Sequence, residues 1–310
     1  MTDAAAIATA DHLMRHWQGP EPGGVRIGSE AHKRLFCRML LETHNPYKPA
    51  KIEWPQLDEQ AKARLLSLPI WDIAVQTEGR ASIRVKTFAA RIADAVLRPA
   101  LDMDAAEEAR HKDVLSNLVA AYGIALAPEP AYPPPADAEW AWLVTGFSEC
   151  IDSFFAFGLF EVARRSGYFP AALVEAFEPV MQEETRHILF FANWVAWYRR
   201  TMPLWRRPWF FCKVLGVWAF LVWERIGIAR GFDKVGNAQD ANFAMTGAGS
   251  VGIDITPREL FALCLAENDR RMAGYDRRLL RPATVPGLVR LALKFMGPSR
   301  SAGENKTQNG

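Results

Sequence analysis

Residues 107–111 read E-E-A-R-H, and residues 183–187 read E-E-T-R-H. Both strings lie in stretches with helical periodicity, and residues three apart on a helix are neighbours on one face. A carboxylate and an imidazole are ligand types that suit iron or manganese. Each string therefore places a candidate metal chelate on one helix: Glu108 with His111, and Glu184 with His187.

Two such pairs supply too few ligands for two octahedral metals, so two more acids are needed. They should lie on two other helices, each about thirty residues before a chelating pair. One helix and its connection must bring the chain back to the same height along the bundle as the acid. Glu78 precedes Glu108 by thirty positions and is the only acid between Ile73 and Arg91. It is the first predicted partner.

The second partner is predicted in the apolar run W-L-V-T-G-F-S-E-C-I-D-S-F-F, which contains Glu149. Glu149 precedes Glu184 by thirty-five positions. Two competitors lie nearby: Asp152 is on nearly the same face one turn later, and Glu161 points about 120° away on an ideal helix. We favour Glu149.

The resulting order, E-x28-E-E-A-R-H followed by E-x33-E-E-T-R-H, resembles the repeated signature of the ferritin-like di-iron carboxylate oxidases and oxygenases over about residues 69–200. In that superfamily a four-helix bundle takes one glutamate from each of two helices and Glu-x-x-His from each of the other two. The resemblance implies two bound irons, with a manganese–iron pair also compatible, and these ligands: Glu78, Glu108, His111, Glu149, Glu184 and His187.

The remaining residues of the repeated string suit supporting roles around such a centre. A ligating histidine needs its other ring N–H held by an acceptor, and Glu107 and Glu183 could each reach the histidine of the opposite helix. Arg110 and Arg186 would balance the surplus negative charge. Members with the closest motif usually have aspartate where this chain has Glu107 and Glu183, which blurs the subfamily assignment.

The pattern along the chain predicts an all-α protein, a ferritin-like four-helix bundle with extra N-terminal and C-terminal helices. We expect a helical lead-in over 1–68, the bundle over 69–202, an apolar and aromatic helical extension over 203–297, and a disordered tail over 298–310. The predicted helices cover about 29–43, 56–66, 69–98, 102–122, 138–165 and 180–200, and a last helix starts at Thr256 with a capping box to Glu259.

Two stretches are predicted to be non-helical connections. Residues 123–136 hold five prolines, which favour an extended connector long enough to cross the height of the bundle. Such a crossover is what the resemblance implies at this place. A glycine-rich loop is expected around 231–252.

The bulk composition excludes several classes of function. The 310 residues have a formal net charge of +2, and nothing in this balance calls for a nucleic-acid partner. The four cysteines form no C-x-x-C and are interpreted as reduced thiols.

The N-terminus shows no secretory signal, so we expect a cytoplasmic protein. The other four histidines are expected to be solvated: His12, His16, His32 and His44.

Residues 203–226 are very apolar and rich in tryptophan. The favoured interpretation is a helix that packs on the bundle or lines a substrate channel. The alternative is peripheral contact with the inner face of the membrane, because arginine and tryptophan are mixed as at a lipid interface. Lys213 and the short run argue against a transmembrane helix.

The expected function is that of a di-iron oxidoreductase with dioxygen as co-substrate, an oxidase or oxygenase such as a monooxygenase. It would act on a small organic, lipophilic or aromatic substrate with an external electron donor, as a monomer or dimer, and the aromatic C-terminal region would close its pocket. The first alternative is a ferroxidase or iron-handling protein of the ferritin kind. The second is a structural bundle that holds metal for stability.

Overall fold

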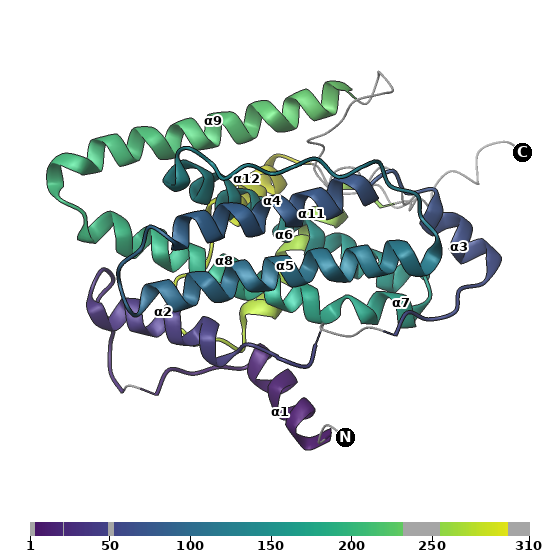
Figure 1. Cartoon of the computed structure of the whole chain (residues 1–310), viewed down its shortest axis with the longest axis horizontal. Coiled ribbons are helices and arrows are strands. Elements are labelled where there is room, and N and C mark those ends of the chain that lie inside the picture. The colour runs from purple at the N-terminus through teal and green to yellow at the C-terminus, as the bar shows by residue number, and fades with distance from the viewer. Residues whose placement is uncertain (1–3, 21, 49–52, 232–254, 297–310) are drawn as a thin grey trace, which may run out of the picture.

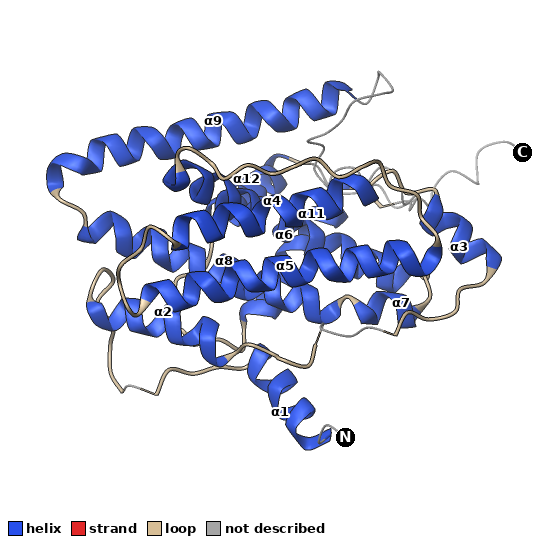
Figure 2. Ribbon diagram, in the orientation of Figure 1, coloured by secondary structure: helices blue, strands red, loops and turns tan. Residues whose placement is uncertain are grey.

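The computed structural model describes residues 4–20, 22–48, 53–231 and 255–296. These residues form helices joined by loops and turns, with no β-strand among them (Figure 1, Figure 2). One isolated parallel β-bridge joins Trp17 to Tyr275 and ties the N-terminal segment to the C-terminal one. The all-α prediction is confirmed for the part of the chain that the structure describes.

Four long helices lie side by side at the centre of the molecule (Figure 1). Their order in the chain is α4 (Trp71–Ala89), α5 (Leu97–Tyr122), α6 (Ala138–Ser166) and α8 (Glu178–Thr201). Contacts join α4 to α5 and to α6, α6 to α8, and α8 to α5. The two repeated strings lie on α5 and α8, which belong to this central group.

The predicted division between the first two of these helices is wrong. The sequence predicts one helix over 69–98 and the next over 102–122, but α4 ends at Ala89 and α5 begins at Leu97. The Asp94 carboxylate accepts hydrogen bonds from the backbone N–H groups of Val96 and Leu97, each at 2.9 Å. Because these are donors that a helix start leaves unsatisfied, Asp94 fixes the beginning of α5 one turn earlier than expected.

The proline-rich connector runs the full length of α4, as predicted (Figure 1). It follows Gly123, whose φ of 68° ends α5 in the left-handed conformation. At one end the N–H of Ala127 donates to Asp72, in the first turn of α4, at 2.7 Å. At the other end Arg91, just beyond α4, donates to the carbonyl of Ala136 at 3.2 Å.

The N-terminal lead-in packs on the outside of the central helices. It comprises α1 (Ala4–Arg15), α2 (Glu30–Glu42) and α3 (Glu59–Leu66), and a short α7 (Ala171–Ala176) precedes α8. Helix α2 contacts both α5 and α8. Ser29 caps it by accepting from the N–H of His32 at 3.1 Å. This position puts α2 directly behind the repeated strings.

Aromatic side chains fill the core around Trp142 and Trp194. The ring of Trp142 lies 5.6 Å from that of Phe88 and 5.3 Å from that of Phe191. A Cβ at Gly146 would come within 2.1 Å of the Phe191 ring, so only glycine admits this ring against α6. Trp142 and Trp194 are therefore core residues.

The C-terminal segment adds helices to the outside of α6. They are the 3-10 turn η1 (Leu204–Arg206), α9 (Arg207–Gly231), α11 (Pro257–Met272) and α12 (Thr284–Phe295). The predicted capping box between Thr256 and Glu259 is confirmed. The tail predicted for 298–310, and the glycine-rich loop predicted for 231–252 apart from its first residue, lie outside the described residues.

Helix α6 is long and apolar enough to cross a membrane, and it is the one such helix among the described residues. It contacts α4, α8, α9 and α11 in the molecule. Burial among these neighbours accounts for its apolar composition, so this property is weak evidence for a membrane span.

Close packing of α6 against α11 at Gly158 predicts a sensitive position. A Cβ at Gly158 would lie 2.3 Å from the sulfur of Cys264 and 3.1 Å from its backbone. Gly158→Ala should therefore lower the free energy of unfolding by about 1–3 kcal/mol, measured by urea denaturation. Gly287→Ala is the matched control, because a Cβ there would meet no neighbouring atom within 4 Å. That variant should be as stable as the parent or gain about 1 kcal/mol.

Candidate metal centre

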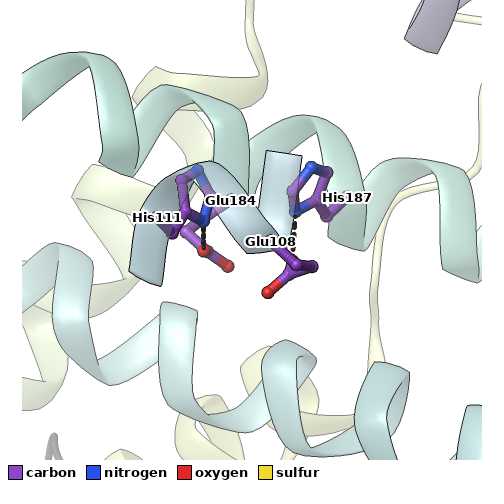
Figure 3. Close-up of side chains that lie close together, drawn as sticks. All are labelled: Glu108, His111, Glu184 and His187. Atoms are coloured by element: carbon purple, nitrogen blue, oxygen red, sulfur yellow. Dashed lines mark ion pairs between the residues drawn. The ribbon is translucent and has the colours of Figure 1, made fainter. Parts of the chain in front are cut away.

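The structure brings four side chains of the two repeated strings to one point (Figure 3). They are Glu108 and His111 from α5, and Glu184 and His187 from α8, and one ligand atom of each lies within 4.8 Å of the others. Each histidine faces the glutamate of the opposite string. His187 Nδ1 lies 2.8 Å from Glu108 Oε1, and His111 Nδ1 lies 3.1 Å from Glu184 Oε1.

The atoms that face this point lack hydrogen bonds. The Nδ1 atoms of His111 and His187 and the Oε1 atom of Glu108 are buried and have no hydrogen-bond partner. Buried polar groups almost always have a partner, and leaving one unmade costs about 1–3 kcal/mol. A bound cation would satisfy converging nitrogen and oxygen atoms that lack hydrogen bonds.

The outer nitrogen of each imidazole is held by a glutamate of the opposite helix. His111 Nε2 lies 2.8 Å from Glu183, and His187 Nε2 lies 2.8 Å from Glu107. The structure thus contains both contacts that the spacing predicts. A carboxylate at Nε2 keeps the proton on that nitrogen and leaves Nδ1 as the atom able to bind a metal.

The two arginines of the strings pair with these same glutamates. Arg186 donates to both oxygens of Glu107 at 2.8 Å, and Arg110 forms an ion pair with Glu183. His44 also contacts Glu107, at 2.6 Å. His44, Glu107 and Glu183 lie close enough together to suggest a second metal cluster. Their pairing with the arginines accounts for that cluster without a cation.

The two predicted partner acids line the same cavity but stand outside the tight group of four. The cavity measures about 200 Å³, and both Glu78 and Glu149 lie in its wall with Glu108 and Glu184. Glu78 Oε2 is 3.9 Å from His111 Nδ1. Glu149 Oε1 is buried without a hydrogen bond.

The competing acids on α6 have other partners. Glu161 accepts from Arg164 and Arg165 at 2.6 Å, and these arginines lower the pKa of Glu161 to about 2. It does not line the cavity. Asp152 lines the cavity but accepts from Ser148 at 2.9 Å and from Arg225 at 2.8 Å. The geometry therefore favours Glu149 as the available carboxylate of α6.

Asp104 is a site residue that the sequence reasoning missed. Its side chain is 1% exposed, both of its oxygens lack hydrogen bonds, and Oδ1 lies 3.8 Å from His187 Nε2. It stands four residues before Glu108, so it shares that helical face. The spacing D-x3-E was the signal that could have found it.

The expectation of solvated histidines in the lead-in is half wrong. His12 and His16 are exposed and their rings stack at 4.6 Å. His32 is fully buried and bonds Asn193 at 2.9 Å, because α2 packs against α8. His44 is partly buried against Glu107 for the same reason.

Burial and mutual repulsion raise the pKa values of three acids in the cavity, Glu78, Glu108 and Glu149, whereas His111, His187 and Ser153 outweigh burial at Glu184 and lower its pKa. Burial is the largest cause at Glu108 and Glu149, and repulsion from Glu184 and from Glu108, respectively, adds to it, so both pKa values lie well above the ordinary range. Burial and Glu184 raise the pKa of Glu78 to about 7. Without a cation these carboxyls hold protons near neutral pH.

The pKa values of His111 and His187 are raised, whereas burial without a charged partner would lower the pKa of an imidazole. Burial alone would lower the pKa of His187, but Asp104 and Glu107 raise it to about 10. Burial likewise opposes the charge on His111, and the carboxylates of Glu183 and Glu184 on either side of the ring hold its pKa well above the ordinary value. Both imidazoles are thus protonated at neutral pH in the metal-free chain.

The cavity wall combines these polar groups with apolar side chains. Small and aliphatic residues line one part of it, including Ala74, Ala81, Val114 and Val144. The C-terminal region contributes Glu224 and Arg225 but no aromatic residue to the lining. The C-terminal region thus reaches the cavity through these two charged residues, and its described aromatic side chains lie elsewhere.

Comparison of the chain with models of protein families, with curated proteins and with solved structures gave no match. The chemistry of the site is therefore the basis for assigning a function. Its nitrogen and carboxylate donors suit iron or manganese, and each histidine has the carboxylate partner that metal-binding histidines usually have.

The choice between the acids of α6 can be tested by metal content. Glu149→Gln should lower the content of iron bound anaerobically, because it removes a negative ligand from the cavity. Asp152→Asn is the matched control on the same helix and should leave the iron content unchanged. Elemental analysis after desalting measures both variants. Equal iron in Glu149→Gln and the parent, with a loss in Asp152→Asn, would assign the ligand to Asp152.

Metal binding should also release protons. At neutral pH Glu78, Glu108, Glu149 and the two imidazoles hold protons that a cation must displace, so affinity should rise as the pH rises through about 7. An indicator dye in weak buffer during anaerobic addition of Fe²⁺ measures the release. Glu161→Gln should release as many protons as the parent, because Glu161 is already ionised. A pH-independent affinity without proton release would contradict this assignment.

Proposed function

We propose that this chain is a di-iron oxidase or oxygenase with a ferritin-like four-helix bundle, formed by α4, α5, α6 and α8. The observation that carries the proposal is the pair of opposed strings on α5 and α8. Each brings an imidazole nitrogen that makes no hydrogen bond against the glutamate of the other, and the opposite nitrogen is already held by a carboxylate. Ordinary structural ion pairs do not need this arrangement.

The residues present fit two divalent cations in ligand type and charge. Arg186 and Arg110 pair with Glu107 and Glu183. The carboxylates that remain around the imidazoles are Glu78, Asp104, Glu108, Glu149 and Glu184. Buried like charges of this kind each cost several kcal/mol unless they are protonated or neutralised. Glu78, Glu108, His111, Glu149, Glu184 and His187 would hold the metals.

Two ferrous ions held in this way would supply electrons to dioxygen. The protein itself supplies orientation and exclusion of water. Glu107 and Glu183 fix the ring orientation and the protonated nitrogen of the two histidines, while Arg186 is fully buried and anchored by Thr43 at 2.6 Å. Helix α2 therefore supports the proposed metal site on the side away from the cavity.

The cavity indicates the class of substrate. Its aliphatic wall favours a small lipophilic group beside the carboxylates, and its volume of about 200 Å³ suits a small molecule or one part of a larger one. Repeated turnover needs an external electron donor. The choice between hydroxylation and other oxidations follows from the substrate.

Oxygen consumption by the iron-loaded protein tests the proposal. Protein purified anaerobically and loaded with Fe²⁺ should bind about two irons per chain and consume oxygen when mixed with it. His187→Ala should lose most of both, because it removes one ligand from the opposed pair. Glu161→Ala should keep both, since Glu161 pairs with Arg164 and Arg165 away from the cavity.

Other outcomes would redirect the assignment. Catalytic uptake of many irons into a mineral by a large shell-like oligomer would identify an iron-storage function instead. Tight iron binding without any reaction with oxygen would identify a structural metal. No retained iron or manganese after loading would contradict the metal centre itself.

A further inference from the structure

The outward face of α9 is apolar along its whole described length. Side chains are described for its residues 207–226, and every exposed residue among them is apolar: Pro208, Trp209, Phe211, Cys212, Leu215, Ala219, Val222, Trp223 and Ile226. Trp209 is 74% exposed and Trp223 is 70% exposed. In Figure 1 this helix lies along the edge of the molecule.

Two basic residues of α9, Lys213 and Arg225, point toward α6 instead. Lys213 pairs with Asp137 at 2.8 Å and with Glu139 at 2.9 Å, at the start of α6. Arg225 pairs with Asp152 of α6 at 2.8 Å. A helix on a water-exposed surface normally turns its charges outward and its apolar stripe inward. Here ion pairs lie on the inner side and the apolar stripe is left outside.

Aromatic and basic residues lie at the ends of this stripe. Trp205 in the preceding turn η1 is 74% exposed, Trp209 follows one turn later, and Trp223 lies at the far end. The helix between Trp209 and Trp223 spans roughly 21 Å. The exposed Arg199 precedes it, as does the partly exposed Arg206, which pairs with Glu139 at 2.9 Å. Tryptophan and arginine combine an apolar body with a polar tip, as at the boundary between lipid tails and headgroups.

Charge decides between a lipid surface and a second copy of the chain. In a symmetric dimer the same patch would lie on both copies, so each stripe would meet another stripe. The only acid in residues 199–226 is Glu224, whose side chain is 25% exposed and contacts Arg225. A second copy would therefore bring no exposed acid of this stripe to its arginines. An anionic bilayer supplies negative headgroups to the arginines and hydrocarbon to the tryptophans.

We propose that the outer face of η1 and α9 lies on the surface of an anionic lipid bilayer. The same helix supplies Glu224 and Arg225 to the cavity wall, and Arg225 donates to Ser148 at 3.0 Å there. A lipophilic substrate dissolved in the bilayer then reaches the carboxylates along α9. This route rests on the proposed function, whereas the membrane contact does not depend on it.

Flotation of the full chain with vesicles tests the contact. The protein should float with vesicles of phosphatidylcholine mixed with phosphatidylglycerol, less with phosphatidylcholine alone, and less with the mixture at high salt. The double variant Trp209→Asp/Trp223→Asp should bind at least about tenfold more weakly, because it replaces two apolar anchors. Leu66→Asp is the matched control on α3, at a leucine that is 45% exposed, and should float like the parent.

Three results would overturn the proposal. They are a parent protein that floats with neither vesicle, a double variant that floats as well as the parent, and a parent that dimerises through this face without floating. Circular dichroism and bound iron should be unchanged in the double variant, since both tryptophans are exposed and lie outside the cavity lining. Flotation involves neither metal nor oxygen, so its failure is distinct from failure of the oxidase assignment.

Discussion

The structure depends on a concentration of buried acids and imidazoles where α5 and α8 face each other. Charges removed from water are tolerated only when they are paired, protonated or bound to a cation. Glu107 and Glu183 satisfy this condition through Arg186, Arg110 and the outer histidine nitrogens. On the cavity side no arginine among the described residues pairs with Glu108 or Glu149, and the raised pKa values of these two carboxyls express the same cost. Two cations would remove it.

The surrounding helices can be understood as support for this arrangement. Helix α2 packs behind α5 and α8, and there Thr43 and the carbonyl of Leu40 accept hydrogen bonds from Arg186. Trp142 and Trp194 fill the core that α6 and α8 share. Rigid packing on these sides fixes the positions of the imidazoles, while the cavity stays open between α4, α5 and α6. A preorganised metal site requires this combination of a held outer side and an accessible inner side.

Sequence reasoning reached the site residues whose positions follow from local geometry. The spacing within each string fixes Glu108 beside His111 and Glu184 beside His187, whatever the rest of the fold. Glu149 and Glu78 followed from helix length, and both line the cavity. The burial of His32 and the contact of His44 with Glu107 depend on where α2 packs, and the packing position of a helix cannot be predicted from a local sequence pattern. Asp104 was missed because a single acid one turn earlier resembles an ordinary surface residue.

The boundaries and outer surfaces were less predictable for similar reasons. Asp94 begins α5 through two backbone hydrogen bonds within a stretch whose periodicity alone looks continuous with α4. The apolar run of α9 was expected to pack or to line a channel, with membrane contact as the alternative, and one side of it does pack into the core through Phe210, Val217 and Leu221. Which side of α9 is exposed could be stated only from the structure, where one face of α9 packs on α6 and the opposite face has no neighbour among the described residues. Composition reports how apolar a helix is, but not which sides are covered.

Anomalous X-ray scattering at the iron edge, from crystals of protein loaded anaerobically with Fe²⁺, tests the central claim most directly. We predict two anomalous peaks inside the cavity, one beside His111 Nδ1 and one beside His187 Nδ1, with carboxylates of both repeated strings around them. Iron bound only at the surface, or imidazoles that remain in contact with the opposed glutamates without a metal peak between them, would contradict the account.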